Sequence, residues 1–170
     1  MSQIERGQQW LKSLLELTGV STEIKGELEA KNTSGGSDAP EGGSYWLTID
    51  ETKLTPEQIQ ILIGTDGSVL DAMQYLVNST LNLNQEPQQQ ASYTIELNGY
   101  RVKRQAEIQA IAQNAAEQVR NYGQQVEIKS LSSAERRQVH TFLKEFTDLE
   151  TFSQGKEPHR HLIVRPAETQ

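Results

Sequence analysis

The chain has 170 residues, a formal net charge of −7 and no cysteine. Disulfides and thiol-based metal sites are therefore excluded, and the negative charge argues against a protein that binds every polyanion without discrimination. No apolar run is long enough to cross a bilayer and the N-terminus lacks a signal-peptide pattern, so we expect a soluble, cytoplasmic protein without membrane insertion. The length fits one domain or two small ones.

The charge is distributed unevenly along the chain. Residues 1–99 contain 5 Lys/Arg and 14 Asp/Glu, whereas residues 100–170 contain 11 Lys/Arg and 9 Asp/Glu. All three histidines also lie in the second part. We therefore expect the C-terminal part to supply most of the attraction for any polyanionic partner.

The first fifty residues predict a helix followed by two strands. Leucines at helical spacing predict a helix over 3–18 that stops near Gly19. Strands are predicted at 22–28 and 45–49, the second from strict alternation of apolar residues. The stretch 31–44 between them is rich in Gly, Ser, Asp, Asn and Pro, so we expect a mobile loop that joins antiparallel strands.

The next fifty residues predict two helices and a strand. Thr55-Pro56-Glu57-Gln58 is a capping box with proline at the first helical position, and the short helix that it starts should end at Gly64. A longer amphipathic helix should follow Gly67, and a Gln-rich turn region at 82–92 precedes a strand at 93–97. The predicted order of the first part is α-β-β-α-α-β.

The second part predicts a long helix and then β-α-β-β. The long helix should run over 100–122 and end at Gly123, followed by a short strand at 126–128. We divide the chain by residue number into a first domain, a connecting helix, a C-terminal domain and a short tail, at 1–99, 100–123, 124–166 and 167–170. The fold class is α+β.

The helix that starts at Ser132 carries the most informative pattern. Ser132 and Glu135 form a second capping box. Apolar residues at helical spacing should face a core: Val139, Phe142, Leu143 and Phe146. Arg136, His140 and Lys144 fall at i, i+4 and i+8 and form a cationic stripe. That stripe suits a phosphate-rich partner, and a solvated helix face is the alternative.

Several separated positions then agree with a known family. Arg136-x-x-x-His140, the stretch 150–160 and the apolar 162–164 together resemble the small single-stranded nucleic-acid-binding domain named for its Arg-xxx-His signature. More narrowly, they resemble the C-terminal domain of the bacterial Jag family, also called SpoIIIJ-associated or KhpB. The resemblance implies that Arg136, His140 and Arg160 bind single-stranded RNA, with single-stranded DNA as an alternative, and Lys144 is a further candidate.

Gly64-Thr65-Asp66-Gly67 is a Gly-x-x-Gly pair between two helices. On its own such a pair favours a simple helix–turn–helix corner, where glycine permits a left-handed backbone. The predicted α-β-β-α-α-β order, however, is the layout of a KH domain, whose Gly-x-x-Gly loop clamps backbone nucleotides. Residues 62–78 resemble the KH segment of Jag, which implies a type II KH domain. The family usually has a basic residue in this loop, whereas this chain has Thr65 and Asp66.

Three further cations lie at the start of the long helix. Arg101, Lys103 and Arg104 are unfavourably placed against a helix N-terminus, so an external anion is one reason for their presence. A solvated face is equally consistent with them. Residues 98–104 also resemble the run that follows the last KH strand in Jag.

Three classes of function compete. The first is a non-enzymatic RNA-binding protein and post-transcriptional regulator. In the second, an interaction adaptor, the KH domain pairs with a smaller KH protein and RNA is bound weakly or through the C-terminal domain alone. The third is an enzyme, for which His159-x-His161 with His140 would have to hold a metal. No catalytic signature accompanies these histidines, so we expect no metal, no cofactor and no enzymatic activity.

Two of the proposed RNA contacts have structural alternatives. His140 is either a ligand-binding residue or a packed helix residue that holds the domain together. Arg160 either binds RNA or pairs with Glu157, or with Glu150 across a loop.

Overall fold

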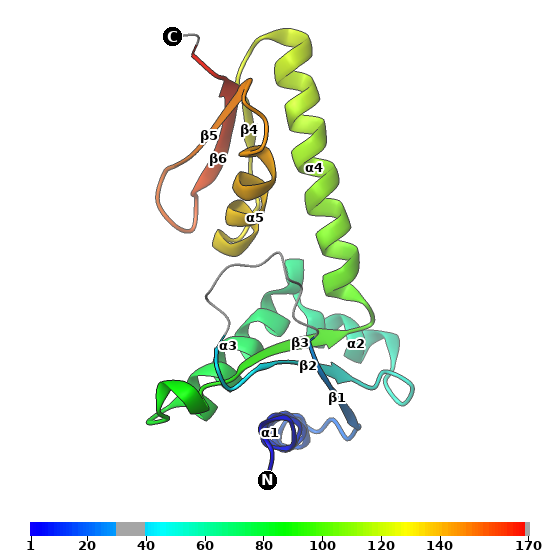
Figure 1. The fold of residues 1–170 in the computed structure, drawn as a ribbon. Coiled ribbons are helices and arrows are strands. Elements are labelled where there is room, and N and C mark those ends of the chain that lie inside the picture. The colour runs from blue at the N-terminus through cyan, green and yellow to red at the C-terminus, as the bar shows by residue number, and fades with distance from the viewer. Residues whose placement is uncertain (30–39, 169–170) are drawn as a thin grey trace. The chain divides into compact units, whose positions relative to one another are not determined.

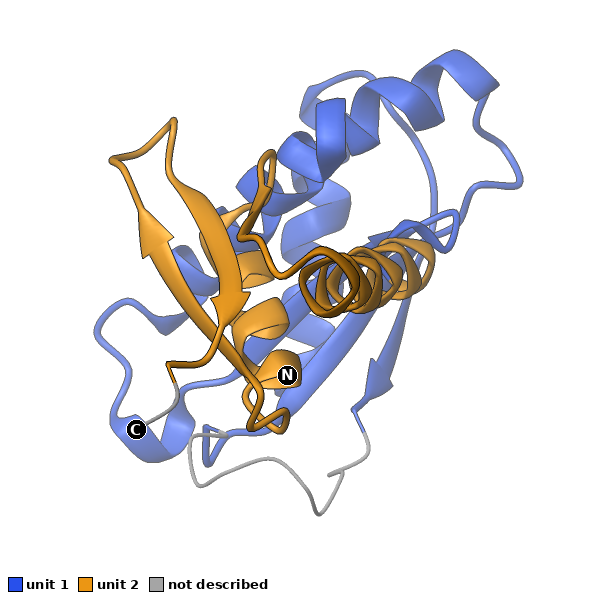
Figure 2. Ribbon diagram, turned by 90° about the horizontal axis from the view of Figure 1, so that it is seen from above, with its two compact units in different colours: residues 1–101 blue, residues 102–170 orange. Residues whose placement is uncertain are grey.

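The computed structural model describes residues 1–29 and 40–168 (Figure 1). It contains two compact units, residues 1–101 and 102–170 (Figure 2), and each is described by itself. Residues 31–39 of the predicted loop lie outside the described residues, and a Gly43-to-Pro40 backbone hydrogen bond of 3.0 Å closes a turn just after them. In the described part of the chain, no helix is both long and apolar enough for a membrane crossing.

The first unit has the predicted order of elements. A three-stranded sheet has the order β1-β2-β3, in which β1 and β2 are antiparallel and β2 and β3 are parallel. The elements are α1 (Gln3–Leu17), β1 (Ile24–Leu28), β2 (Ser44–Ile49), α2 (Pro56–Ile63), the 3₁₀ turn η1 (Thr65–Gly67), α3 (Ser68–Asn82), the 3₁₀ turn η2 (Pro87–Gln89) and β3 (Ser92–Leu97).

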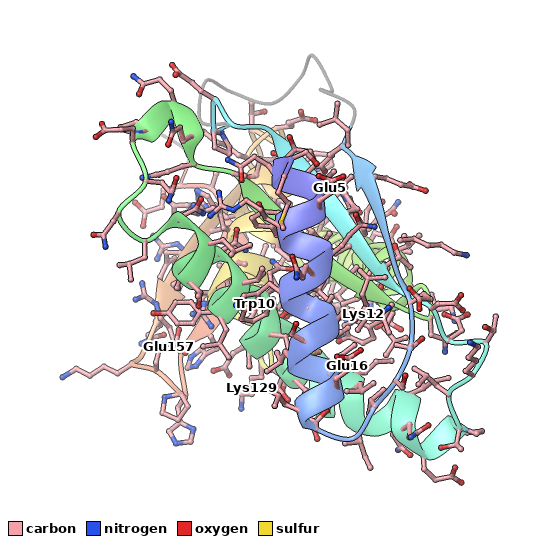
Figure 3. All side chains as sticks on the ribbon, turned by 90° about the horizontal axis from the view of Figure 1, so that it is seen from below. Glu5, Trp10, Lys12, Glu16, Lys129 and Glu157 are labelled. Carbon is pink, nitrogen blue, oxygen red and sulfur yellow. The ribbon has the colours of Figure 1, made fainter. Side chains whose placement is uncertain are left out.

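Alternation along the strands produces a one-sided sheet in this unit. Leu47 and Ile49 of β2 are paired in register with Ile95 and Leu97 of β3, and all four are buried. Side chains two apart on a strand share a face, so these residues build one apolar surface. The helices bury their own leucines in the same core as this surface. Figure 3 shows α1 between α3 and β1.

Local signals set the ends of these helices. The predicted capping box at Thr55 is present, with the side chain of Thr55 accepting from the Gln58 backbone at 3.1 Å. Ser2 and Glu5 form another box at the start of α1. The predicted stop at Gly64 is confirmed, because this residue has φ +74° and a Cβ there would lie 2.6 Å from the Val69 side chain.

The second unit is a three-stranded antiparallel sheet covered by two helices on one side (Figure 2). Its strand order is β4-β6-β5, so the last strand lies in the middle. The elements are α4 (Tyr100–Tyr122), whose first two residues belong to the first unit, then β4 (Val126–Ile128), α5 (Ser133–Leu143), β5 (Leu149–Gln154) and β6 (His161–Pro166).

The core of the second unit includes most of α4. Ile108, Ala112 and Val119 are buried in one cluster with Val139 of α5 and Leu162 of β6. The segment 100–123, expected as a connecting helix, thus contributes a packed face to this unit. Alanines on that face allow the helix to approach its neighbours closely, and their small side chains weaken the apolar periodicity.

Candidate nucleic-acid interface

Arg136 is the centre of a buried polar cluster on α5. Its side chain is only 5% exposed. The guanidinium donates to the carbonyl oxygens of Leu131 at 2.8 Å and Arg160 at 3.2 Å, and it forms an ion pair with Glu157. A guanidinium presents five donors in a fixed fork, so it can hold several acceptors at once. Arg136 therefore fastens the loop between β5 and β6 to the start of α5.

The expected cationic stripe on α5 is divided by burial. Arg136 points into the domain, whereas His140 and Lys144 are exposed. The sequence contained a signal for this, because Arg136 lies three residues before Val139 and seven before Leu143. These are the positions of the apolar face.

His140 and Lys144 lie on the exposed side of the same helix. The Nδ1 atom of His140 is hydrogen-bonded to the hydroxyl of Thr151 on β5, which fixes the plane of the ring. The other ring nitrogen and one ring face remain as contacts for a ligand. Lys144 follows the last residue of α5, and its backbone N–H donates to the His140 carbonyl at 2.9 Å.

The β5–β6 loop, residues 155–160, carries the exposed cations nearest to this helix face. Lys156, His159 and Arg160 are all exposed. Glu157 projects from the same loop (Figure 3) and pairs with Arg136. Within residues 1–29 and 40–168, neither Lys156 nor Arg160 has a carboxylate partner. The loop therefore presents cations whose charge is not neutralised by a neighbouring acid.

Both ion-pair alternatives for Arg160 are absent from the described contacts. Glu157 is taken by Arg136, and Glu150 accepts from Arg165 at 2.7 Å. The three residues that the resemblance grouped together, Arg136, His140 and Arg160, do lie around one place. Arg136 contacts the main chain of Arg160, and His140 is one helical turn farther along.

The two histidines spaced two apart have other partners. The Nε2 atom of His161 is 2.6 Å from the Glu127 carboxylate, and its Nδ1 atom is 3.2 Å from the carbonyl oxygen of His159. Across the part of the chain that the structure describes, no group of three or more His, Cys, Asp or Glu side chains is arranged to hold a metal ion.

The cations at the start of α4 have carboxylate neighbours. Arg101 pairs with Asp71 at 2.7 Å, and Arg104 pairs with Glu135 at 2.8 Å. The buried carboxylate of Glu96 accepts from the backbone N–H of Arg101 at 3.1 Å and so compensates the positive helix end. Internal ion pairs thus account for Arg101 and Arg104 without an external anion. Lys103 is exposed.

The Arg104–Glu135 pair joins α4 to α5. Burial by itself raises the pKa of the Glu135 carboxyl, but hydrogen bonds from Arg104 and Ser132 and the charge of Arg104 outweigh it. The pKa of Glu135 is therefore below its ordinary value, and the carboxylate is charged at neutral pH.

The Gly64–Gly67 loop has the backbone of a tight turn and an acidic tip. Gly64 and Gly67 have φ values of +74° and +77°, and Asp66 also has a positive φ of 53°. Thr65 and Asp66 are exposed. A Cβ at Gly67 would lie 2.5 Å from the ring of Tyr100, so close packing also requires glycine here.

No cation of the first unit lies near that tip in sequence. Between Lys53 and Arg101 the chain has no Lys or Arg, whereas Glu57, Asp66 and Asp71 lie on or beside the two helices that flank the loop. The loop therefore offers glycines and backbone N–H groups but presents a carboxylate to its surroundings. Phosphate binding here would have to overcome that repulsion.

Comparison with known proteins places these geometries in a family. Residues 106–166 match the family model of the Arg-xxx-His domain. The chain is 29% identical to the RNA-binding protein KhpB of Bacillus subtilis (strain 168) over 130 residues, 72% of this chain and 62% of that protein. It is 32% identical over 111 residues to the protein of the same name from Clostridium symbiosum, covering 65% and 49% of the two chains.

The chain belongs to the Jag/KhpB family. A third relative, the RNA-binding protein KhpB of Lactiplantibacillus plantarum, is 30% identical over 118 residues, or 69% of this chain and 34% of the relative. The chain thus spans less than two thirds of the length of each of these KhpB relatives. The match to the Arg-xxx-His domain begins inside α4 and contains Arg136, His140 and Arg160.

Proposed function

We propose that this chain is a non-enzymatic, cytoplasmic single-stranded RNA-binding protein whose main contact is the surface formed by the β5–β6 loop and the exposed side of α5. The observation that carries the proposal is the loop itself. Lys156 and Arg160 are exposed and have no carboxylate partner among the described residues, and the buried Arg136 fixes the loop from behind. The name of the curated KhpB relatives supports RNA as the ligand.

Each residue of this surface has a distinct task in the proposal. Lys156 and Arg160 bind phosphates, and the guanidinium of Arg160 can also stack on a base. His140, oriented by Thr151, offers a ring face and one nitrogen to a nucleotide. Lys144 extends the cationic surface along α5. Arg136 is a positioning residue, since its donors are occupied by the protein.

A post-transcriptional regulatory role completes the proposal. In it, the first unit is a type II KH domain, supported by its α-β-β-α-α-β order and the Gly-x-x-Gly turn. The predicted contacts of Gly64, Thr65, Asp66 and Gly67 with RNA would be weak, because no Lys or Arg accompanies them.

The decisive experiment is fluorescence anisotropy with a labelled pool of single-stranded RNA over a salt series, with single-stranded DNA in parallel. We compare the wild type with the double variant Lys156→Gln/Arg160→Gln and the single variant His140→Ala. Lys25→Gln, an exposed cation on β1, is the matched control. The double variant should reduce the slope of log K against log salt by about 2, because each phosphate contact contributes about one unit.

Two results would contradict the proposal. One is a wild type that binds neither RNA nor DNA at low salt. The other is a folded double variant with the affinity and salt slope of the wild type, which would place the contact elsewhere. Equal loss in Lys25→Gln would show that only the overall charge matters.

A second candidate function, an adaptor that pairs with a smaller KH protein, is favoured by an apolar groove on the first unit. The groove, of about 570 Å³, lies among α1, α2 and α3 and is lined by Leu15, Ile61, Val69 and Leu76, among others. Ile61 and Leu76 are exposed. Exposed apolar surface of this kind often marks a protein contact. The absence of Lys and Arg from 54–100 also favours a protein over RNA at this unit.

The two functions of the first unit are separated by two variants. Asp66→Lys should tighten RNA binding if the loop lies on the RNA, and it should leave the pairing of an adaptor unchanged. Ile61→Gln/Leu76→Gln should abolish pairing with a purified small KH protein, measured by calorimetry. Tyr75→Gln, exposed on α3 outside the groove, is the control. Unchanged pairing in the groove variant would refute the adaptor surface.

A further inference from the structure

The sheet of the second unit has a face that neither of the unit's helices covers. Leu162 and Val164 of β6 belong to the core formed with α4 and α5. Ile163, between them, points to the opposite face and is not part of that core, although it is only 2% exposed. Its neighbours in register are Phe152 on β5 and Glu127 on β4. Side chains from the neighbouring strands therefore cover Ile163.

Phe152 is the aromatic residue of this outer face. Its side chain is 37% exposed, although burial of such a ring would be favourable. The guanidinium of Arg165 lies over the ring, 4.9 Å from its centroid. Glu150, directly opposite Arg165, holds the guanidinium by a 2.7 Å hydrogen bond. The face thus presents a ring and a planar cation that are held in contact.

This pair is continuous with the loop proposed to bind RNA. Phe152 lies three residues before Gly155, the first residue of the β5–β6 loop, which is about 10 Å along a strand. Gln154 and His161 are paired in register between the ring and the loop. A single strand whose phosphates contact Lys156 and Arg160 could therefore place a neighbouring base at Phe152.

We propose that Phe152 and Arg165 form a base-stacking site for single-stranded RNA on the outer face of the second sheet, an inference that rests on the proposed function. An exposed aromatic ring on an antiparallel sheet is a general way to bind an unpaired base, and a guanidinium plane can extend the stack. Covering Ile163 requires only an apolar side chain, so packing does not explain the choice of an aromatic ring. The stack would add affinity without reading the base sequence.

The test compares Phe152→Leu and Phe152→Trp in the anisotropy assay. Leucine keeps an apolar cover over Ile163 but removes the ring, and tryptophan keeps a stacking surface. Phe152→Leu should weaken binding about 5- to 100-fold with an unchanged salt slope, because a stacked base releases no counterions. Phe152→Trp should bind RNA as tightly as the wild type. Tyr122→Leu, an exposed aromatic on α4, is the matched control and should also bind like the wild type.

Ultraviolet crosslinking of wild-type protein to RNA provides a second measurement that needs no variant. A crosslinked nucleotide on Phe152, found by mass spectrometry, supports the site. Wild-type affinity in folded Phe152→Leu, or crosslinks confined to other residues, overturns it. If Lys156→Gln/Arg160→Gln loses RNA while Phe152→Leu does not, the proposed function stands and this inference fails. If the wild type binds no RNA, both fail.

Discussion

Replacement of Arg136 by methionine separates its role inside the domain from a direct RNA contact. Methionine retains an unbranched side chain in the buried space but removes every donor. The buried carbonyl of Leu131 loses its partner, while water can reach the carbonyl of Arg160 and the Glu157 carboxylate, which is 60% exposed. A buried acceptor left without a hydrogen bond costs roughly 1–3 kcal/mol.

We therefore expect Arg136→Met to lower the free energy of unfolding of the second unit by about 2 kcal/mol. In a unit of this size, such a loss corresponds to a decrease of about 10 °C in the unfolding temperature. Arg136→Lys should recover only part of it, because an ammonium group cannot reproduce the fork that reaches three acceptors. Calorimetry and urea unfolding measure both variants, with Arg137→Met, the exposed neighbour on α5, as the control.

The RNA assay supplies the second half of this prediction. Arg136→Met should weaken binding because the loop loses its anchor, but the salt slope should not change, since no phosphate contact is removed. Arg160→Gln should do the reverse, with a shallower slope and nearly unchanged stability. An Arg136→Met protein with wild-type stability and a shallower slope would refute the reasoning and make Arg136 a direct phosphate ligand.

Three further predictions concern stability. Because the folded pKa of Glu135 is lowered, its contribution is present above the unfolded value of about 4.3 and is lost as pH falls through the folded pKa. Glu135→Gln should therefore flatten the loss of unfolding temperature between pH 5 and 3 in scanning calorimetry, and a curve parallel to that of the wild type would contradict this. Gly67→Ala should cost roughly 1–3 kcal/mol in urea unfolding, because φ is +77° and the methyl group would meet Tyr100; a neutral result would mean that the turn tolerates a side chain. Glu96→Ala removes a buried acceptor of the first N–H groups of α4 and should speed hydrogen exchange there, whereas unchanged exchange would show that another group caps the helix.

Elements whose signals are local were predicted well from the sequence. The capping boxes at Thr55 and Ser132 and the predicted helix over 100–122 are confirmed, since caps and helical spacing act within a few residues. The parallel pairing of β2 with β3 joins segments separated by two helices and has no local signature.

The candidate site was harder to predict because charge and burial disagree at one residue. Arg136 was grouped with His140 and Lys144 from its charge, yet its spacing from Val139 and Leu143 is that of a core position. A buried arginine needs partners, and these come from Leu131 and from a loop more than twenty residues away. Only the folded chain brings that loop to the helix.

The hold of Arg136 on the β5–β6 loop also affects how such a surface can change during evolution. Arg136 grips the loop through one main-chain carbonyl and through Glu157, and neither contact uses the side chains of Lys156, His159 or Arg160. Residues at these positions can be exchanged without altering the path of the backbone that carries them. New ligand preferences can therefore arise by single substitutions on an unchanged frame, and a mutant library restricted to the loop would keep its fold.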